Sequence, residues 1–202
     1  MDARIAVLAS GVGSNLQALL DDPIVRPWVA LVVSDSREAR ALERGRGAGV
    51  EAMFLDPAAF GDRARFDAAL LALFVDRDIG FVVNAGFMRI LGPEIVRAYE
   101  GRWLNIHPSL LPSFPGANAV PDALAWGVKV TGATVHLLDE EVDHGPIVLQ
   151  QAVPVLEDDD QWSLHGRIQE AEHHIYKSAV RALVEGRVHV KGRRTVMAEG
   201  PA

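Results

Sequence analysis

The sequence predicts an α/β fold with a doubly wound, mostly parallel sheet and an antiparallel extension in the C-terminal half. Short apolar runs alternate with helical patterns along the first half, which is typical of strands buried on both faces. Two later strands alternate polar and apolar residues and are joined by a glycine-bearing loop. No repeat or linker interrupts the pattern, so we expect one domain over residues 1–202, with halves at 1–107 and 108–202.

The parallel part is predicted from five apolar runs and the helical patterns between them. Strands are expected at residues 4–9, 30–35, 52–55, 81–86 and 103–107, and helices at 16–20, 38–46, 63–75 and 93–99. Gly47 and Gly49 end the second helix, and Pro93 suits the start of the fourth. Ligands of such sheets bind at the carboxyl ends of strands, so the loops after the first, fourth and fifth strands are the places to search.

The second half begins with a long loop that contains several prolines. A helix is expected at 119–126, and the alternating strands at 133–139 and 147–155. The acidic cluster 157–160 suits the N-terminus of a helix expected over 162–185, because negative charge stabilises that end. The chain is then predicted to form an edge hairpin that turns at Gly192.

Composition excludes several classes of function. A net charge of −7 argues against a chain-wide basic surface, so no nucleic-acid partner is expected. The absence of cysteine excludes disulfides, cysteine-based metal sites and thiol nucleophiles. No apolar run approaches the roughly 18 residues of a membrane span, and no signal segment precedes the first strand. We therefore expect a cytoplasmic protein without a membrane partner.

A glycine-rich loop, residues 11–15, follows the first strand. Glycines permit a tight turn, and the N-terminus of the next helix offers N–H groups to an anion. The loop is not a triphosphate loop, since no Lys-Ser/Thr follows, and Leu16 stands where the dinucleotide fingerprint needs its third glycine. Two interpretations stay open, a phosphate site and a plain strand–helix turn capped by Ser14 or Asn15.

The loop after the fourth strand carries four bulky apolar residues, Phe87, Met88, Ile90 and Leu91. Because a ligand of the sheet would lie there, they could form a slot for a flat organic group. The alternative is ordinary core beneath the next helix.

Asn105 and His107 end the fifth strand and point to the same face. An amide and a protonated imidazole are suitable donors for a developing oxyanion. Asp143 belongs to an acidic run, 139–143, from which it could reach His107, favour its charged form and transfer protons. The alternatives are a buried polar pair satisfied by backbone and a solvated acidic turn.

Other polar motifs give weaker signals. Glu170 and His173 have the Glu-x-x-His spacing of di-iron bundles, but a single copy without partner helices gives no reason to expect a metal. His136 could face either the site or the core. The chain has no Gly-x-Ser-x-Gly elbow, which argues against a serine hydrolase.

Four stretches together resemble the phosphoribosylglycinamide formyltransferase family: the loop ending Gly13-Ser14-Asn15, AGFMRIL at 85–91, NIHPSLLPSFPG at 105–116 and TGATVHLLDEEVDHGPIVLQ at 131–150. The resemblance implies a Rossmann-like formyltransferase fold. It also implies transfer of the formyl group of 10-formyltetrahydrofolate, as co-substrate and without a metal, to the primary amine of glycinamide ribonucleotide in purine biosynthesis. The implied route is direct attack through a tetrahedral intermediate.

The resemblance also implies roles for individual residues. Asn105, His107 and Asp143 match the catalytic trio. The residues matching the ribonucleotide site are Gly13, Ser14, Asn15, Gln169, Glu170 and Glu172. Those matching the folate site are Arg63, Met88, Arg89, Ile90, Leu91, Asn105, Asp139, Glu140, Glu141, Val142 and Asp143. The expected partners are thus two small molecules, bound by a monomer or a homodimer.

Two positions depart from the family pattern, and two rival functions stay open. Asn118 stands where a histidine is usual and cannot take up a proton at neutral pH, and Asp35 stands where asparagine is common. Relatives that formylate initiator tRNA or hydrolyse formylfolate carry a further domain, for which 202 residues leave no room. The rivals are formyl transfer to another small amine, such as an amino sugar, and binding of folate or nucleotide without turnover.

Overall fold

The computed structural model describes residues 3–198. The chain divides into two compact units, one ending at Leu104 and the other beginning at Asn105. The division falls inside strand β5 (Trp103–His107), slightly before the boundary expected at residue 107. A single domain over the whole chain stays a prediction.

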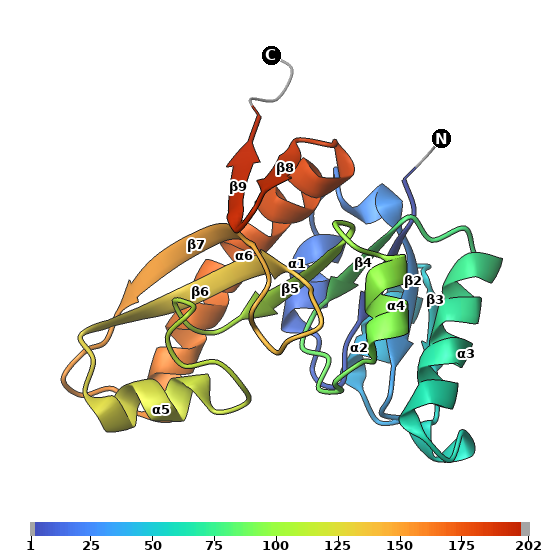
Figure 1. The fold of residues 1–202 in the computed structure, drawn as a ribbon. Coiled ribbons are helices and arrows are strands. Elements are labelled where there is room, and N and C mark those ends of the chain that lie inside the picture. Colours follow the sequence, from blue (N-terminus) through green and yellow to red (C-terminus); the bar gives the residue numbers. More distant parts are fainter. Residues whose placement is uncertain (1–2, 199–202) are drawn as a thin grey trace. The chain divides into compact units, whose positions relative to one another are not determined.

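The first unit alternates strands and helices (Figure 1). Its complete strands are β1 (Ile5–Leu8), β2 (Val29–Ser34), β3 (Glu51–Phe54) and β4 (Phe81–Asn84). Its helices are α1 (Ser14–Leu20), α2 (Arg40–Gly47), α3 (Arg63–Asp76) and α4 (Pro93–Ala98), with short 3₁₀ turns at Arg26–Trp28 and Pro57–Ala59. β1 pairs in parallel with β2 and β4, and β2 with β3. Every residue of β1 is buried, which explains why this strand is a continuous apolar run.

Aromatic packing anchors α3 and α4 in this unit. The rings of Phe74, Tyr99 and Trp103 meet edge to face at centroid distances of 5.5–6.1 Å. The Tyr99 hydroxyl donates to the Ile79 carbonyl, so the buried phenol is satisfied.

The second unit contains the end of β5, α5 (Ala119–Trp126), β6 (Val130–Leu137), β7 (Ile147–Pro154), α6 (Gln161–Val184), β8 (Val188–Lys191) and β9 (Arg194–Met197). β6 and β7 are antiparallel, and α6 packs against both. Asp160 and Ser163 form a reciprocal capping box at the start of α6. β8 and β9 form a separate hairpin that contacts β7.

The strand order of the main sheet is β3-β2-β1-β4-β5-β6-β7, so the order reverses between β1 and β4. The predicted α/β class, a mostly parallel sheet with an antiparallel extension, is confirmed. β6 begins at Val130 rather than at residue 133, and the two 3₁₀ turns were not expected. Within residues 3–198, no helix combines the length and the apolar character that a membrane crossing requires.

Candidate active site

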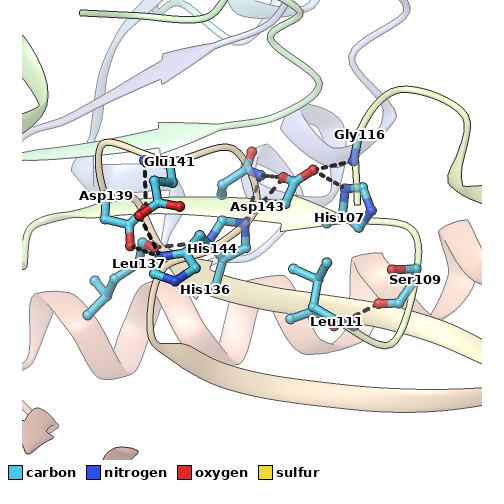
Figure 2. Close-up of polar contacts among 12 residues, drawn as sticks. His107, Ser109, Leu111, Gly116, His136, Leu137, Asp139, Glu141, Asp143 and His144 are labelled. Carbon is cyan, nitrogen blue, oxygen red and sulfur yellow. Dashed lines mark hydrogen bonds and ion pairs between the residues drawn. The ribbon is translucent and has the colours of Figure 1, made fainter. Parts of the chain in front are cut away.

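Asp143, distant in sequence, meets Asn105 and His107 at the end of β5. The Asp143 carboxylate lies with Oδ1 3.4 Å from Asn105 Nδ2 and Oδ2 3.3 Å from His107 Nδ1. Figure 2 shows one carboxylate oxygen of Asp143, Oδ2, facing both His107 and the Gly116 backbone, whose N–H donates to it over 2.7 Å. An amide, an imidazole and a carboxylate therefore share one location, where they could stabilise an oxyanion and move a proton.

The loop carrying Asp143 has a constrained backbone. Asp143 adopts a left-handed conformation, φ 52°, which costs a non-glycine residue about 1–2 kcal/mol. A Cβ at Gly145 would lie 1.8 Å from the Leu137 carbonyl oxygen, so only glycine fits there. The Leu137 N–H donates to the Pro146 carbonyl over 2.9 Å and closes the base of the loop. The path of the loop thus determines where the carboxylate of Asp143 lies.

His136 on β6 is a fourth member of the cluster, and its direction could not be assigned from the sequence. It is fully buried, with Nδ1 2.9 Å from the Leu137 carbonyl oxygen and Nε2 3.0 Å from Asn105 Nδ2. Because a carbonyl only accepts, the proton lies on Nδ1, and Nε2 accepts from the amide of Asn105. The two amide hydrogens of Asn105 are thereby directed at His136 and Asp143.

The ionisation of this cluster differs from the expectation in one respect. Burial lowers the pKa of His107 below its usual 6.5, and the Phe114 carbonyl and Asp143, which act in the opposite direction, do not offset it. Burial also opposes ionisation of Asp143, but hydrogen bonding, including the bond from the Gly116 N–H, lowers the pKa of Asp143. Burial thus disfavours the charged form of His107 that was expected from the sequence, while Asp143 beside the ring favours that form.

The donors of the cluster are all engaged in the structure. His107 Nε2 lies 2.8 Å from the Phe114 carbonyl and donates to it, while Nδ1 faces Asp143. Its 3.3 Å separation from the carboxylate is longer than the about 2.7–2.9 Å of a charge-assisted hydrogen bond. A substrate oxygen can reach His107 Nε2–H only by replacing the Phe114 carbonyl. Phe114 itself is left-handed, φ 53°.

In the first unit, the loops after β1 and β4 lie together. The Ser10 N–H donates to the Gly86 carbonyl over 3.0 Å, and the Ser10 hydroxyl accepts from the Met88 N–H over 2.9 Å. Gly13 is left-handed, φ 72°, and its Cβ would lie 2.9 Å from Ala41 Cβ. Glycine is therefore required at the start of α1, where Ser14 and Asn15 form the first turn.

The side chains of the β4 loop divide between core and surface. Phe87 is buried, whereas Met88 and Ile90 are 72% and 63% exposed, so these two do not form core beneath α4. Arg89 stacks on the Phe66 ring at 5.0 Å. Asp67, buried on α3, accepts from the Gly92 N–H over 2.7 Å and fixes the end of the loop.

The other expected ligand-contacting residues lie on α3, on α6 and in the 138–146 loop. Arg63 begins α3. On α6, Glu172 is buried, Gln169 is half-buried and Glu170 is exposed. Asn118 is exposed just before α5, and its side chain does not cap that helix. Among residues 3–198, no three His, Asp or Glu side chains are grouped as a metal site requires.

A family model described as formyl transferase matches residues 3–180. The chain belongs to the formyl transferase family. The phosphoribosylglycinamide formyltransferase of Mycobacterium tuberculosis is 47% identical over 196 residues, which cover 96% of this chain and 91% of that protein. The Homo sapiens trifunctional purine biosynthetic protein adenosine-3 is 42% identical over 191 residues, 93% of this chain and 19% of that protein.

Solved structures agree with the family assignment. The crystal structure of glycinamide ribonucleotide transformylase 1 from Symbiobacterium toebii has a TM-score of 0.95 and 48% identity, covering 98% of this chain and 94% of that one. The family resemblance expected from the motifs is confirmed. The formyl transferase match ends at residue 180, before the β8–β9 hairpin. The roles of individual residues stay predictions.

Proposed function

We propose that this formyl transferase carries the formyl group of 10-formyltetrahydrofolate to the primary amine of glycinamide ribonucleotide, in cytoplasmic purine biosynthesis and without a metal. The observation that carries the proposal is the meeting of Asn105, His107 and Asp143 around one location. The proposal is also supported by the sequence similarity to a phosphoribosylglycinamide formyltransferase, which covers 96% of the chain.

The reaction begins when the substrate amine attacks the formyl carbon. A C–N bond forms, and the former carbonyl oxygen gains negative charge in a tetrahedral intermediate. His107 Nε2–H donates to this oxygen in place of the Phe114 carbonyl, and Asn105 supplies an amide hydrogen in place of its contact with His136 or Asp143. The resting contacts thus hold both donors ready without leaving a buried donor unpaired.

Collapse of the intermediate requires a proton to move. The attacking nitrogen carries a surplus proton, and the folate nitrogen N10 needs one as its bond to the formyl carbon breaks. Asp143, whose lowered pKa favours the ionised form, can accept the first proton, and the pair of Asp143 and His107 can return one to N10. The exchange balances, because one proton leaves the amine and one reaches the folate.

Binding of the two substrates is assigned to the expected residues. The loop at Gly13, Ser14 and Asn15 would hold the phosphate with backbone N–H groups, and residues 169, 170 and 172 of α6 would contact the ribonucleotide. Exposed Met88 and Ile90, together with Arg63, Arg89, Leu91 and residues 139–143, would line the folate site. We expect these small molecules to be the ligands of a monomer or a homodimer.

The decisive experiment is a spectrophotometric assay for deformylated folate. Purified protein with 10-formyltetrahydrofolate should release the product only when glycinamide ribonucleotide is added. Release of the product with an amino sugar but not with the ribonucleotide would show that the amino sugar is the formyl acceptor. Binding of both ligands by calorimetry without any release would instead indicate a binding protein.

A further inference from the structure

The turn of the β8–β9 hairpin contacts the loop that carries Asp143. Arg193 lies between the two strands of the hairpin, beyond the end of the family match at residue 180. Its guanidinium makes two contacts with one residue, His144: Nη1 lies 3.0 Å from the ring nitrogen Nε2, and Nη2 donates to the backbone carbonyl over 2.5 Å. His144 directly follows Asp143, so the arginine contacts the residue next to the left-handed one, at its ring and at its carbonyl.

The protons of this contact can be assigned. A guanidinium only donates, so His144 Nε2 must accept, and the ring proton lies on Nδ1. Nδ1 in turn donates to Asp139 Oδ2 over 2.7 Å (Figure 2). The other oxygen of Asp139 accepts from the Glu141 N–H over 3.1 Å. Arg193, His144 and Asp139 thus form a continuous chain of hydrogen bonds across the loop.

The hairpin also contacts the strand that leaves the loop. The Thr195 hydroxyl on β9 donates to the Ile147 carbonyl over 2.6 Å. Ile147 begins β7 and pairs with His136, the residue that accepts from Asn105. The hairpin therefore holds the loop at two places, His144 and the first residue of β7.

We propose that Arg193 is a positioning residue for formyl transfer, which places the carboxylate of Asp143 by fixing the His144 peptide. The inference rests on the proposed function. Without the guanidinium, the His144 carbonyl and ring lose their donors, and the left-handed residue 143 can relax. Asp143 then no longer holds its place between Asn105, His107 and Gly116.

Three variants separate positioning from a general effect of charge or folding. Arg193→Ala removes both contacts, and Arg193→Lys keeps one donor. Arg194→Ala is the matched control, because it removes the same charge from the next residue, which is exposed at the start of β9. We expect Arg193→Ala to lower kcat roughly tenfold, with little change in KM for the ribonucleotide. Arg193→Lys should recover part of kcat, and Arg194→Ala should match the parent protein.

A double-mutant cycle with His144→Ala tests the route of the effect. Alanine removes the ring contact but keeps the carbonyl that accepts from Nη2, so the double variant should be faster than the product of the two single effects predicts. An Arg193→Ala variant as fast as Arg194→Ala would overturn the proposal. Thermal unfolding of each variant checks that the rates are compared between folded proteins.

The outcomes distinguish this proposal from the proposed function. If the parent protein releases no deformylated folate in the presence of glycinamide ribonucleotide, the proposed function fails. If the parent is active and Arg193→Ala equals its control, the function stands and the positioning role of Arg193 is wrong.

Discussion

Asn105 is held by two acceptors at once, His136 Nε2 and Asp143 Oδ1. Replacing it with alanine removes the side-chain amide of the cluster, while Asp143 keeps its contact with the Gly116 N–H through Oδ2 and His136 keeps its contact with the Leu137 carbonyl through Nδ1. Because loss of one oxyanion donor typically costs about 10²–10³ in rate, we expect kcat of Asn105→Ala to fall by that factor with little change in KM. Steady-state kinetics measures both constants. A kcat of Asn105→Ala close to that of the parent protein would show that Asn105 does not stabilise the oxyanion.

Asp143 combines a structural contact with a chemical one. In Asp143→Asn the side chain can still accept from the Gly116 N–H, but it loses the charge that faces His107. We therefore expect a larger loss of kcat than of folate affinity. Comparing kcat with the folate Kd from fluorescence titration tests this. A collapse of folate binding with kcat preserved at saturation would contradict a role in proton transfer.

The sequence predicted the members of the trio but not their surroundings. Strand alternation places Asn105 and His107 on one face, and this holds wherever β5 lies. The Phe114 carbonyl and the proton on His136 Nδ1 depend instead on the path of loops that no periodic pattern encodes. Burial of His107 is likewise a property of the packed cluster, which is why its lowered pKa could not be predicted from spacing.

At the scale of the elements, one glycine in β6 and one in α6 should respond in opposite ways when each is replaced by alanine. A Cβ at Gly132 of β6 would lie 2.1 Å from the Gln151 carbonyl oxygen and 2.9 Å from a Leu110 methyl group. Gly166 is exposed on α6 and has open space around its Cβ position. Gly132→Ala should therefore lower the free energy of unfolding by about 1–3 kcal/mol. Gly166→Ala should raise it by about 0.5–1 kcal/mol.

Urea denaturation of both variants beside the parent protein measures these changes. The same substitution in two elements of one unit makes each variant the control of the other. Equal effects, or a stabilised Gly132→Ala, would contradict the close approach of β6 and β7 at this position.

The strands and helices that have a strong hydrophobic pattern are the ones whose type the sequence predicted correctly. β1 is a run of buried residues and α3 has an apolar stripe, so their types follow from the sequence. The 3₁₀ turn Arg26–Trp28 carries no such pattern. β6 begins before its predicted start because its first residue, Val130, is exposed and is recruited by pairing with Pro154, a tertiary effect.

At the scale of the whole molecule, one buried and two half-buried histidines make the free energy of unfolding depend on pH. Burial lowers the pKa of His107, His165 and His173 below the usual 6.5. Below pH 6.5 the unfolded chain binds protons that the folded protein does not, so the unfolded state gains stability as the pH falls. The free energy of unfolding should therefore be largest above pH 6.5 and decrease between pH 7.5 and 5.5.

Urea denaturation at pH 7.5, 6.5 and 5.5 measures this slope. The lowered pKa of Asp143 acts at lower pH, because the stability from a depressed carboxyl is lost only as the pH falls through 3.8 and below. Replacing His165 and His173 with glutamine should flatten the slope, while His189→Gln, at an exposed position of β8, should leave it unchanged. A free energy of unfolding that is equal at pH 7.5 and 5.5 would mean that these imidazoles take up protons as readily in the folded protein as in the unfolded chain.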